Sequence, residues 1–104
     1  MRILVTGCVG FIGFHLCKEL LKKKNIEILG LDNINSYYST KLKKLRLNYL
    51  KKNRGFKFIK LDISNYSKLK TIFKKNKFDI IINLAAQAGV RYSIINPIEY
   101  VSSN

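Results

Sequence analysis

Three glycines near the start of the chain are spaced so that they could bind a phosphate group. Gly7, Gly10 and Gly13 follow a short apolar run and precede a segment with helical periodicity. A strand, a glycine-rich turn and a helix N-terminus together form an anion site, because the first N–H groups of a helix lack internal acceptors and the helix dipole adds positive charge. We expect Gly7 to form the tight turn, Gly10 to let a pyrophosphate approach the backbone, and Gly13 to let the helix lie against the first strand.

An acidic residue ends the next predicted strand. Asp32 follows the apolar segment 26–31 and is placed to accept hydrogen bonds from a ribose diol, while its charge would repel a 2′-phosphate. The combination predicts NAD rather than NADP. The glycine spacing is G-x-x-G-x-x-G and not the G-x-G-x-x-G of the dinucleotide fingerprint, so an ordinary glycine turn with a helix-capping acid remains the alternative at this point.

Strand-like and helix-like segments alternate along the chain. Strands are expected at 3–5, 26–31, 56–61 and 80–84, and helices at 11–24, from about 41 to 54, and at 66–75. This order implies right-handed crossovers and a mostly parallel sheet. We therefore predict an α/β, Rossmann-like doubly wound sheet of about four strands. Residues 1–104 would be the N-terminal part of an NAD-binding Rossmann domain, truncated before its catalytic and substrate-binding regions and with an exposed sheet edge.

Apolar residues at helical spacing predict which helix faces are buried. In the first helix Ile12, Leu16 and Leu20 recur every four positions, and Cys17 lies beside them. In the second helix the predicted face is Leu42, Leu45 and Tyr49, and in the third it is Leu69, Ile72 and Phe73.

Composition argues against a membrane-spanning, secreted or metal-binding protein and leaves a nucleic-acid-binding module as an alternative. The formal charge of +14 raises the alternative of a basic nucleic-acid-binding module. The lysines are spread over predicted helix surfaces and turns, which favours solvated faces and no nucleic-acid partner. The chain has no apolar run long enough to span a membrane and no signal-peptide pattern, so we expect a cytoplasmic protein. Cys8 and Cys17 are expected to be free thiols, and a single His leaves no metal site.

Three segments carry a resemblance to a known family. "VTGCVGFIG" at 5–13 resembles the Thr-Gly-x-x-Gly-x-x-Gly motif of the short-chain dehydrogenase/reductases, in the extended branch of NAD-dependent nucleotide-sugar epimerases and dehydratases. "GLDNINSYYS" at 30–39 and "LAAQAGVRYS" at 84–93 make the UDP-glucuronate 4-epimerases the most similar subgroup, and the similarity extends over all 104 residues.

The resemblance implies a set of NAD-binding positions. The pyrophosphate loop would comprise Gly7, Gly10, Phe11, Ile12 and Gly13. The adenosine ribose would meet Asp32 and Asn33, with Asn35 and Ser36 as weaker candidates, and the adenine ring would meet Asp62 and Ile63. The nicotinamide side would be lined by Leu84, Ala85, Ala86 and Gln87, with Asn104 near the same ribose. Arg91 is the candidate for binding the sugar nucleotide, because a guanidinium pairs well with phosphate or carboxylate.

The resemblance also implies an activity for the complete protein. It would be an NAD-dependent isomerase, a homodimer, that interconverts UDP-glucuronate and UDP-galacturonate by transient oxidation at C4. A 4,6-dehydratase or a UDP-glucose 4-epimerase of the same branch, and a non-catalytic NAD-binding module, remain alternatives. The family's catalytic Tyr-x-x-x-Lys and its Ser or Thr would lie beyond residue 104, so no catalytic residue is assigned and the chain alone is expected to be inactive. The family usually has His where this chain has Asn83.

Overall fold

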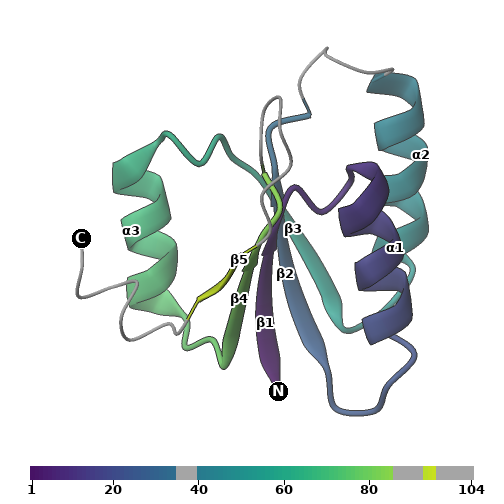
Figure 1. The fold of residues 1–104 in the computed structure, drawn as a ribbon, viewed down its shortest axis with the longest axis horizontal. Helices are drawn as coiled ribbons and strands as arrows, with labels where there is room; N and C mark the ends of the chain where they lie inside the picture. The colour runs from purple at the N-terminus through teal and green to yellow at the C-terminus, as the bar shows by residue number, and fades with distance from the viewer. Residues whose placement is uncertain (35–39, 86–92, 96–104) are drawn as a thin grey trace.

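A computed structural model describes residues 1–34, 40–85 and 93–95 of the chain. In it a twisted sheet separates two helices on one face from a third helix on the other (Figure 1). The elements are β1 (Arg2–Thr6), α1 (Phe11–Leu20), β2 (Glu27–Asp32), α2 (Thr40–Lys51), β3 (Phe56–Lys60), α3 (Tyr66–Lys75), β4 (Ile80–Asn83) and β5 (Ser93–Ile95).

β1 is the centre of the sheet, whose strand order is β3-β2-β1-β4-β5. It pairs in parallel with β2 and with β4, so that Thr6 lies opposite Leu31 on one side and Asn83 on the other. β2 in turn pairs in parallel with β3. This arrangement confirms the predicted Rossmann-like α/β fold and places the ends of β1, β2 and β4 at the same edge of the sheet.

The four predicted strands are present, and β5 is a fifth strand that the sequence did not predict. β5 pairs with β4 in the antiparallel direction, with Ile82 opposite Ile94. No strand was predicted beyond residue 84, because three residues are too few to give a period-2 pattern in a sequence. The edge of β4 is therefore occupied in this structure.

The sheet has a separate apolar cluster on each face. Alternate residues of β1 point to opposite sides, as expected for a strand: Ile3 and Val5 pack with Leu47 and Leu50 of α2, whereas Leu4 packs with residues of α3. Leu69 and Ile72 are buried as predicted and Phe73 packs against the same cluster. Both faces of β1 are thus covered, which explains why its sequence is continuously apolar.

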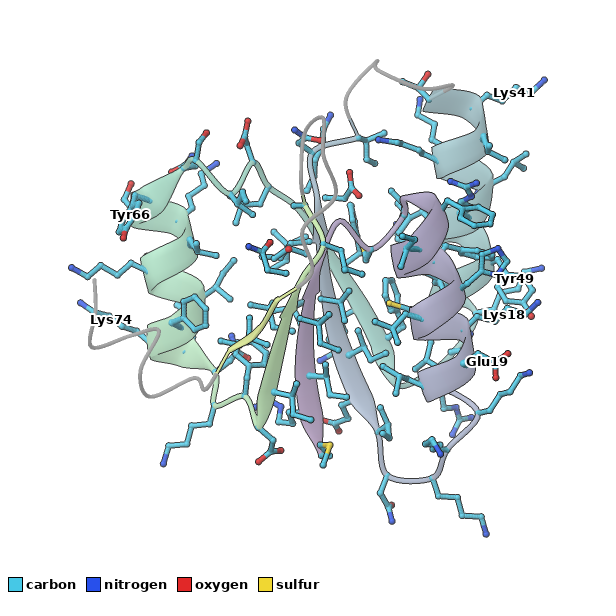
Figure 2. All side chains as sticks on the ribbon, viewed as in Figure 1. Lys18, Glu19, Lys41, Tyr49, Tyr66 and Lys74 are labelled. Carbon is cyan, nitrogen blue, oxygen red and sulfur yellow. The ribbon has the colours of Figure 1, made fainter. Side chains whose placement is uncertain are left out.

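The predicted inner face of α2 was wrong. Leu42, Leu45 and Tyr49 are exposed, and Figure 2 shows Tyr49 beside Lys18 on the outer side of α1 and α2. The buried stripe is Lys43, Leu47 and Leu50. Two stripes of this helix contain apolar residues, and the buried one includes a lysine, whose aliphatic stem can cover apolar surface. Lys43 is also the exception to our prediction that the lysine runs are solvated.

Helix α1 is shorter than predicted and is buried along a slightly different line. It ends at Leu20, and Gly13 and Cys17 are its buried residues. Ile12, expected inside, is exposed, whereas Leu20 and Leu21 pack against the core. The glycine at position 13 lets the backbone itself form part of the buried face, which a count of apolar side chains cannot predict.

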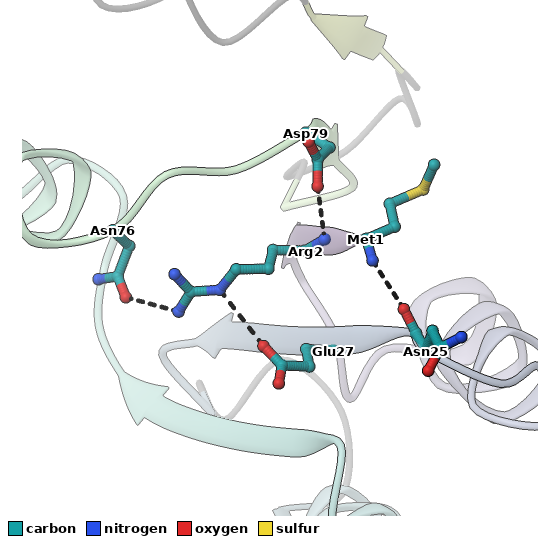
Figure 3. A network of polar contacts seen from close by, with 6 residues as sticks. All are labelled: Met1, Arg2, Asn25, Glu27, Asn76 and Asp79. Atoms are coloured by element: carbon teal, nitrogen blue, oxygen red, sulfur yellow. Dashed lines mark hydrogen bonds and ion pairs between the residues drawn. The ribbon is translucent and has the colours of Figure 1, made fainter.

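Arg2 ties together the edge of the sheet where the strands begin (Figure 3). Its backbone N–H donates to Asp79 Oδ2 at 2.8 Å, and its guanidinium donates to Asn76 Oδ1 at 3.0 Å and lies 3.4 Å from Glu27 Oε2. Nearby, the Met1 amine donates to the carbonyl of Asn25. These contacts join β1 to β2 and to the turn before β4 at the edge opposite the glycines.

We predict that the two faces of α2 respond differently to the same substitution. Leu50→Ala removes a fully buried side chain and should lower the free energy of unfolding by about 2–5 kcal/mol. Leu45→Ala, on the same helix at a side chain that is 59% exposed, is the matched control and should change it by less than about 0.5 kcal/mol. Urea unfolding of both variants measures this, and a larger loss for Leu45→Ala would contradict the observed orientation of α2.

Candidate functional site

Gly7 lies where the turns after β1 and β4 meet. Its φ is +70°, a conformation that favours glycine, and its N–H donates to the carbonyl of Leu31 at 2.7 Å. A Cβ at this position would lie 2.8 Å from the backbone carbon and oxygen of Leu84. The tight turn predicted for Gly7 is therefore present, and the residue also permits a contact with the end of β4.

Gly13 lets α1 lie against the turn that leaves β1. A Cβ here would overlap the carbonyl oxygen of Gly7 and would lie 3.0 Å from Cys8 Cα. Helix α1 packs against β1, with Cys17 in the same apolar cluster as Ile3 and Val5, and the closest approach at Gly13 is to the residues that follow the strand. Any side chain at position 13 would push α1 away from the sheet.

Gly10 differs from Gly7 and Gly13 because, among the described residues, neither its backbone conformation nor a close neighbour requires a glycine at this position. It is the N-cap of α1, with φ −67° and ψ 172°, an extended conformation open to any residue. A Cβ would have Gly7 O, at 3.4 Å, as its nearest neighbour. The Phe14 N–H closes the first helical turn on Gly10 O at 2.9 Å, so the N–H groups of 11–13 lie at the open end of the helix, beside this bare position.

The carboxylate of Asp32 is buried at the end of β2 and reaches the glycine loop. It is 6% exposed, and its two oxygens accept the N–H of Val9 at 3.3 Å and of Ile34 at 2.8 Å. Ile34 has a φ of +50°, which costs about 1–3 kcal/mol for a residue of this type. Because each carboxylate oxygen can accept two hydrogen bonds, these contacts among the described residues leave Asp32 with further acceptor capacity.

A second acidic side chain lies at the end of β3. The Ser64 N–H donates to Asp62 Oδ1 at 2.9 Å, and the Ser64 hydroxyl donates to the same oxygen at 2.9 Å. These bonds, with a further one from the Asn33 side chain, hold the pKa of the exposed Asp62 carboxyl below its usual range. Asn33 and Asp62, both predicted site residues, are thus in contact, and Ile63 follows them half-buried.

The Thr6 hydroxyl fixes the exit of β4. It donates to Asn83 Oδ1 and accepts the N–H of Leu84 at 3.1 Å and of Ala85 at 3.2 Å. At the position where the family usually has His, Asn83 thus accepts a hydrogen bond from the Thr6 side chain. Leu84 and Ala85 are half-buried at the same edge of the sheet as Gly7 and Asp32.

The two cysteines are buried beneath the glycine loop as free thiols. Burial raises the pKa of the Cys8 thiol far above its ordinary range, with Cys17 and Asp32 adding to the effect, and burial raises the pKa of Cys17 to about 12. Gly30 of β2 makes room for this packing, since a Cβ there would lie 2.6 Å from Cys8 Sγ. Both thiols are protonated at neutral pH and serve as small core residues.

Arg46 is a residue of this region that the sequence interpretation missed. It extends from α2 and donates from Nη1 to the carbonyl of Val9, in the glycine loop, at 3.1 Å. We had assigned the basic residues of this helix to solvent. Arg46 is one of four arginines among 20 basic residues, and the use of arginine within a lysine-rich helix is the signal that could have identified it.

The structure brings most of the predicted cofactor residues to one edge of the sheet, and the rest fall outside the described residues. Those outside are Asn35, Ser36, Ala86, Gln87, Arg91 and Asn104. Within the ranges 1–34, 40–85 and 93–95, no three His, Cys, Asp or Glu residues are grouped to hold a metal ion. None of the described helices has the length and apolar character needed to cross a membrane.

Comparisons with known proteins agree with this arrangement. The profile of the GDP-mannose 4,6 dehydratase family matches residues 4–104. A UDP-glucuronate 4-epimerase from Thermodesulfobacterium geofontis is 50% identical over 101 residues, which are 97% of this chain and 31% of the relative. The chain spans about a third of the length of the curated relatives it matches.

Solved structures of two related enzymes have the same fold. The UDP-glucuronic acid 4-epimerase from Bacillus cereus, crystallised with UDP-glucuronic acid and NAD, matches with a TM-score of 0.76 and 40% identity over 88% of this chain and 28% of its own. The dTDP-glucose 4,6-dehydratase from Bacillus anthracis, crystallised with NAD, matches with a TM-score of 0.70 and 26% identity over 85% of this chain and 27% of its own.

We predict that the Thr6 hydroxyl contributes to stability through the β4 exit. Thr6→Val keeps the shape but leaves the Ala85 N–H and the Asn83 amide oxygen without this partner, whereas the Leu84 N–H keeps its bond to the Thr6 carbonyl, so the free energy of unfolding should fall by about 1–3 kcal/mol. Thr71→Val, at an exposed hydroxyl that donates to its own helix, is the control and should have little effect. If denaturant unfolding showed the same loss of unfolding free energy for Thr6→Val and Thr71→Val, this role for Thr6 would be contradicted.

Proposed function

We infer that this chain, which belongs to the GDP-mannose 4,6 dehydratase family, is the NAD-binding part of a nucleotide-sugar 4-epimerase that interconverts UDP-glucuronate and UDP-galacturonate. The observation that carries the proposal is that position 10 has a glycine although the fold has room for a side chain there. The extended backbone of Gly10 and the space around it are compatible with a side chain. The absence of one is explained by a ligand that must approach the start of α1. A pyrophosphate fits this position, because open N–H groups and the helix dipole both favour an anion.

The described residues also fit the other parts of NAD. Asp32 provides a buried carboxylate with remaining acceptor capacity at the end of β2, as a ribose diol requires. Asn33, Asp62 and Ile63 adjoin it on the side proposed for adenine, and Leu84 and Ala85 lie at the end of β4, on the side proposed for nicotinamide. With the predicted residues outside the described ranges, these form the proposed cofactor site.

In this proposal the chain binds and orients the cofactor. The N–H groups of Phe11, Ile12 and Gly13 would hold the pyrophosphate, and Asp32 would hold the adenosine ribose and disfavour a 2′-phosphate. NAD would supply reversible hydride transfer at the sugar C4. The catalytic Tyr and Lys are proposed to lie in a longer gene product, and the 104-residue chain alone is proposed to be inactive.

The substrate and assembly of the complete protein are part of the same proposal. Similarity to a UDP-glucuronate 4-epimerase and to one crystallised with UDP-glucuronic acid supports a UDP-sugar substrate, with Arg91 as the proposed contact. The homodimer, the cytoplasmic location and the absence of a nucleic-acid partner stay predictions.

We predict that Gly10→Ala separates ligand binding from folding. The new Cβ has room within the protein, so the free energy of unfolding should fall by at most about 1 kcal/mol. The methyl group would face the pyrophosphate, and the dissociation constant for NAD⁺ should rise by about tenfold or more in calorimetric titration. Gly13→Ala is the contrasting variant, since its Cβ overlaps Gly7 O and should destabilise the fold itself. Unchanged NAD⁺ binding by folded Gly10→Ala would argue against the site.

We predict that the complete gene product epimerises UDP-glucuronate without added reductant. Chromatography of the sugar nucleotides should show conversion to UDP-galacturonate, with no turnover by the 104-residue chain. Turnover of UDP-glucose in preference to UDP-glucuronate, or formation of a 4-keto-6-deoxy sugar from a nucleotide hexose, would reassign the activity within the branch. Epimerisation by the 104-residue chain alone would contradict the proposed division of roles.

A further inference from the structure

Arg46 of α2 contacts the glycine loop through a hydrogen bond to the backbone carbonyl of Val9. Its Nη1 donates to Val9 O at 3.1 Å, and the guanidinium carbon lies 5.9 Å from the ring centroids of both Phe11 and Phe14. The side chain is half-buried between the two helices. A planar guanidinium can stack on aromatic rings while it donates at its edge, which an ammonium group cannot do.

The residue that Arg46 contacts is held from the other side by Asp32. The N–H of Val9 donates to Asp32 Oδ2 at 3.3 Å, and the next N–H, that of Gly10, donates to Gly7 O at 3.2 Å. Consecutive peptide groups that lead into α1 are therefore tied to β2, to α2 and to the turn itself. Their orientation determines where the open N–H groups at the start of α1 point.

We propose that Arg46 is a positioning residue for recognition of the cofactor pyrophosphate, which it favours by fixing the Val9 peptide and by placing a cation beside the anion site. The inference rests on the proposed function and extends it to a residue outside the glycine motif. The bond to Val9 uses one of the five N–H donors of the guanidinium, so the same group can orient the loop and contribute charge to it. Asp32 and Arg46 then act on opposite ends of one residue to set the shape of the loop.

The test compares a ligand that has a pyrophosphate with one that lacks it. In the complete gene product, Arg46→Met should raise the dissociation constant for ADP by about tenfold and leave that for adenosine within about twofold, because only ADP uses the loop. Arg46→Lys restores the charge without the planar stacking and should weaken ADP binding by about threefold. Arg54→Met removes an exposed arginine after α2 and is the control, with both affinities unchanged.

Each outcome decides the inference. Unchanged ADP binding by Arg46→Met, or an equal loss for ADP and adenosine, would overturn the positioning role, the latter by showing a merely structural one. If Arg46→Met does not fold, Arg46→Lys decides, and unchanged ADP binding overturns the role. If the unaltered protein binds neither ADP nor NAD⁺, it is the proposed function that fails, whereas normal binding by the unaltered protein and by Arg46→Met refutes the role of Arg46 alone.

Discussion

The close approach of three backbone segments at one edge of the sheet is the constraint on which the rest of the structure depends. The turn after β1 contacts the end of β4 through Gly7 and the first turn of α1 through Gly13, at distances that exclude a Cβ from either position. Packing this tight is possible only when the turn has a single conformation. Two side chains fix that conformation, with Asp32 accepting from Val9 and Thr6 bonding three groups of the β4 exit.

This constraint links folding to the proposed chemistry. Because Gly7 and Gly13 satisfy internal packing, α1 starts close to the sheet and its open N–H groups lie beside the turn that follows β1. At position 10, by contrast, the fold does not require a glycine. The same edge holds the buried carboxylate of Asp32, so one arrangement of the backbone produces both parts of the proposed site, the position for the pyrophosphate and the acceptor for the ribose.

The glycine spacing predicted this arrangement because the backbone conformation restricts which residue type can occupy a given position. A positive φ favours glycine and a close approach of backbone requires it, and a strand that ends at an acid places that acid at the carboxyl edge of a parallel sheet, as Gly7 and Asp32 show. The register of Thr6 with Asn83 could not be predicted, since it depends on strand pairing between residues far apart. The inner face of α2 was predicted wrongly, because Lys43 occupies the stripe that faces the sheet. The contact of Arg46 with the carbonyl of Val9 was also missed, since a contact between residues 37 positions apart leaves no periodic signal.

In the proposed site the start of α1 and the end of β2 bind NAD together. The most direct measurement is a titration of isotope-labelled protein with NAD⁺, followed by NMR of the backbone amides. We expect the amide signals of Phe11, Ile12 and Gly13 to shift together with those next to Asp32, and NADP⁺ at the same concentration to shift them much less. Absence of these shifts, or shifts confined to the opposite edge around Arg2 and Asp79, would contradict the proposed site.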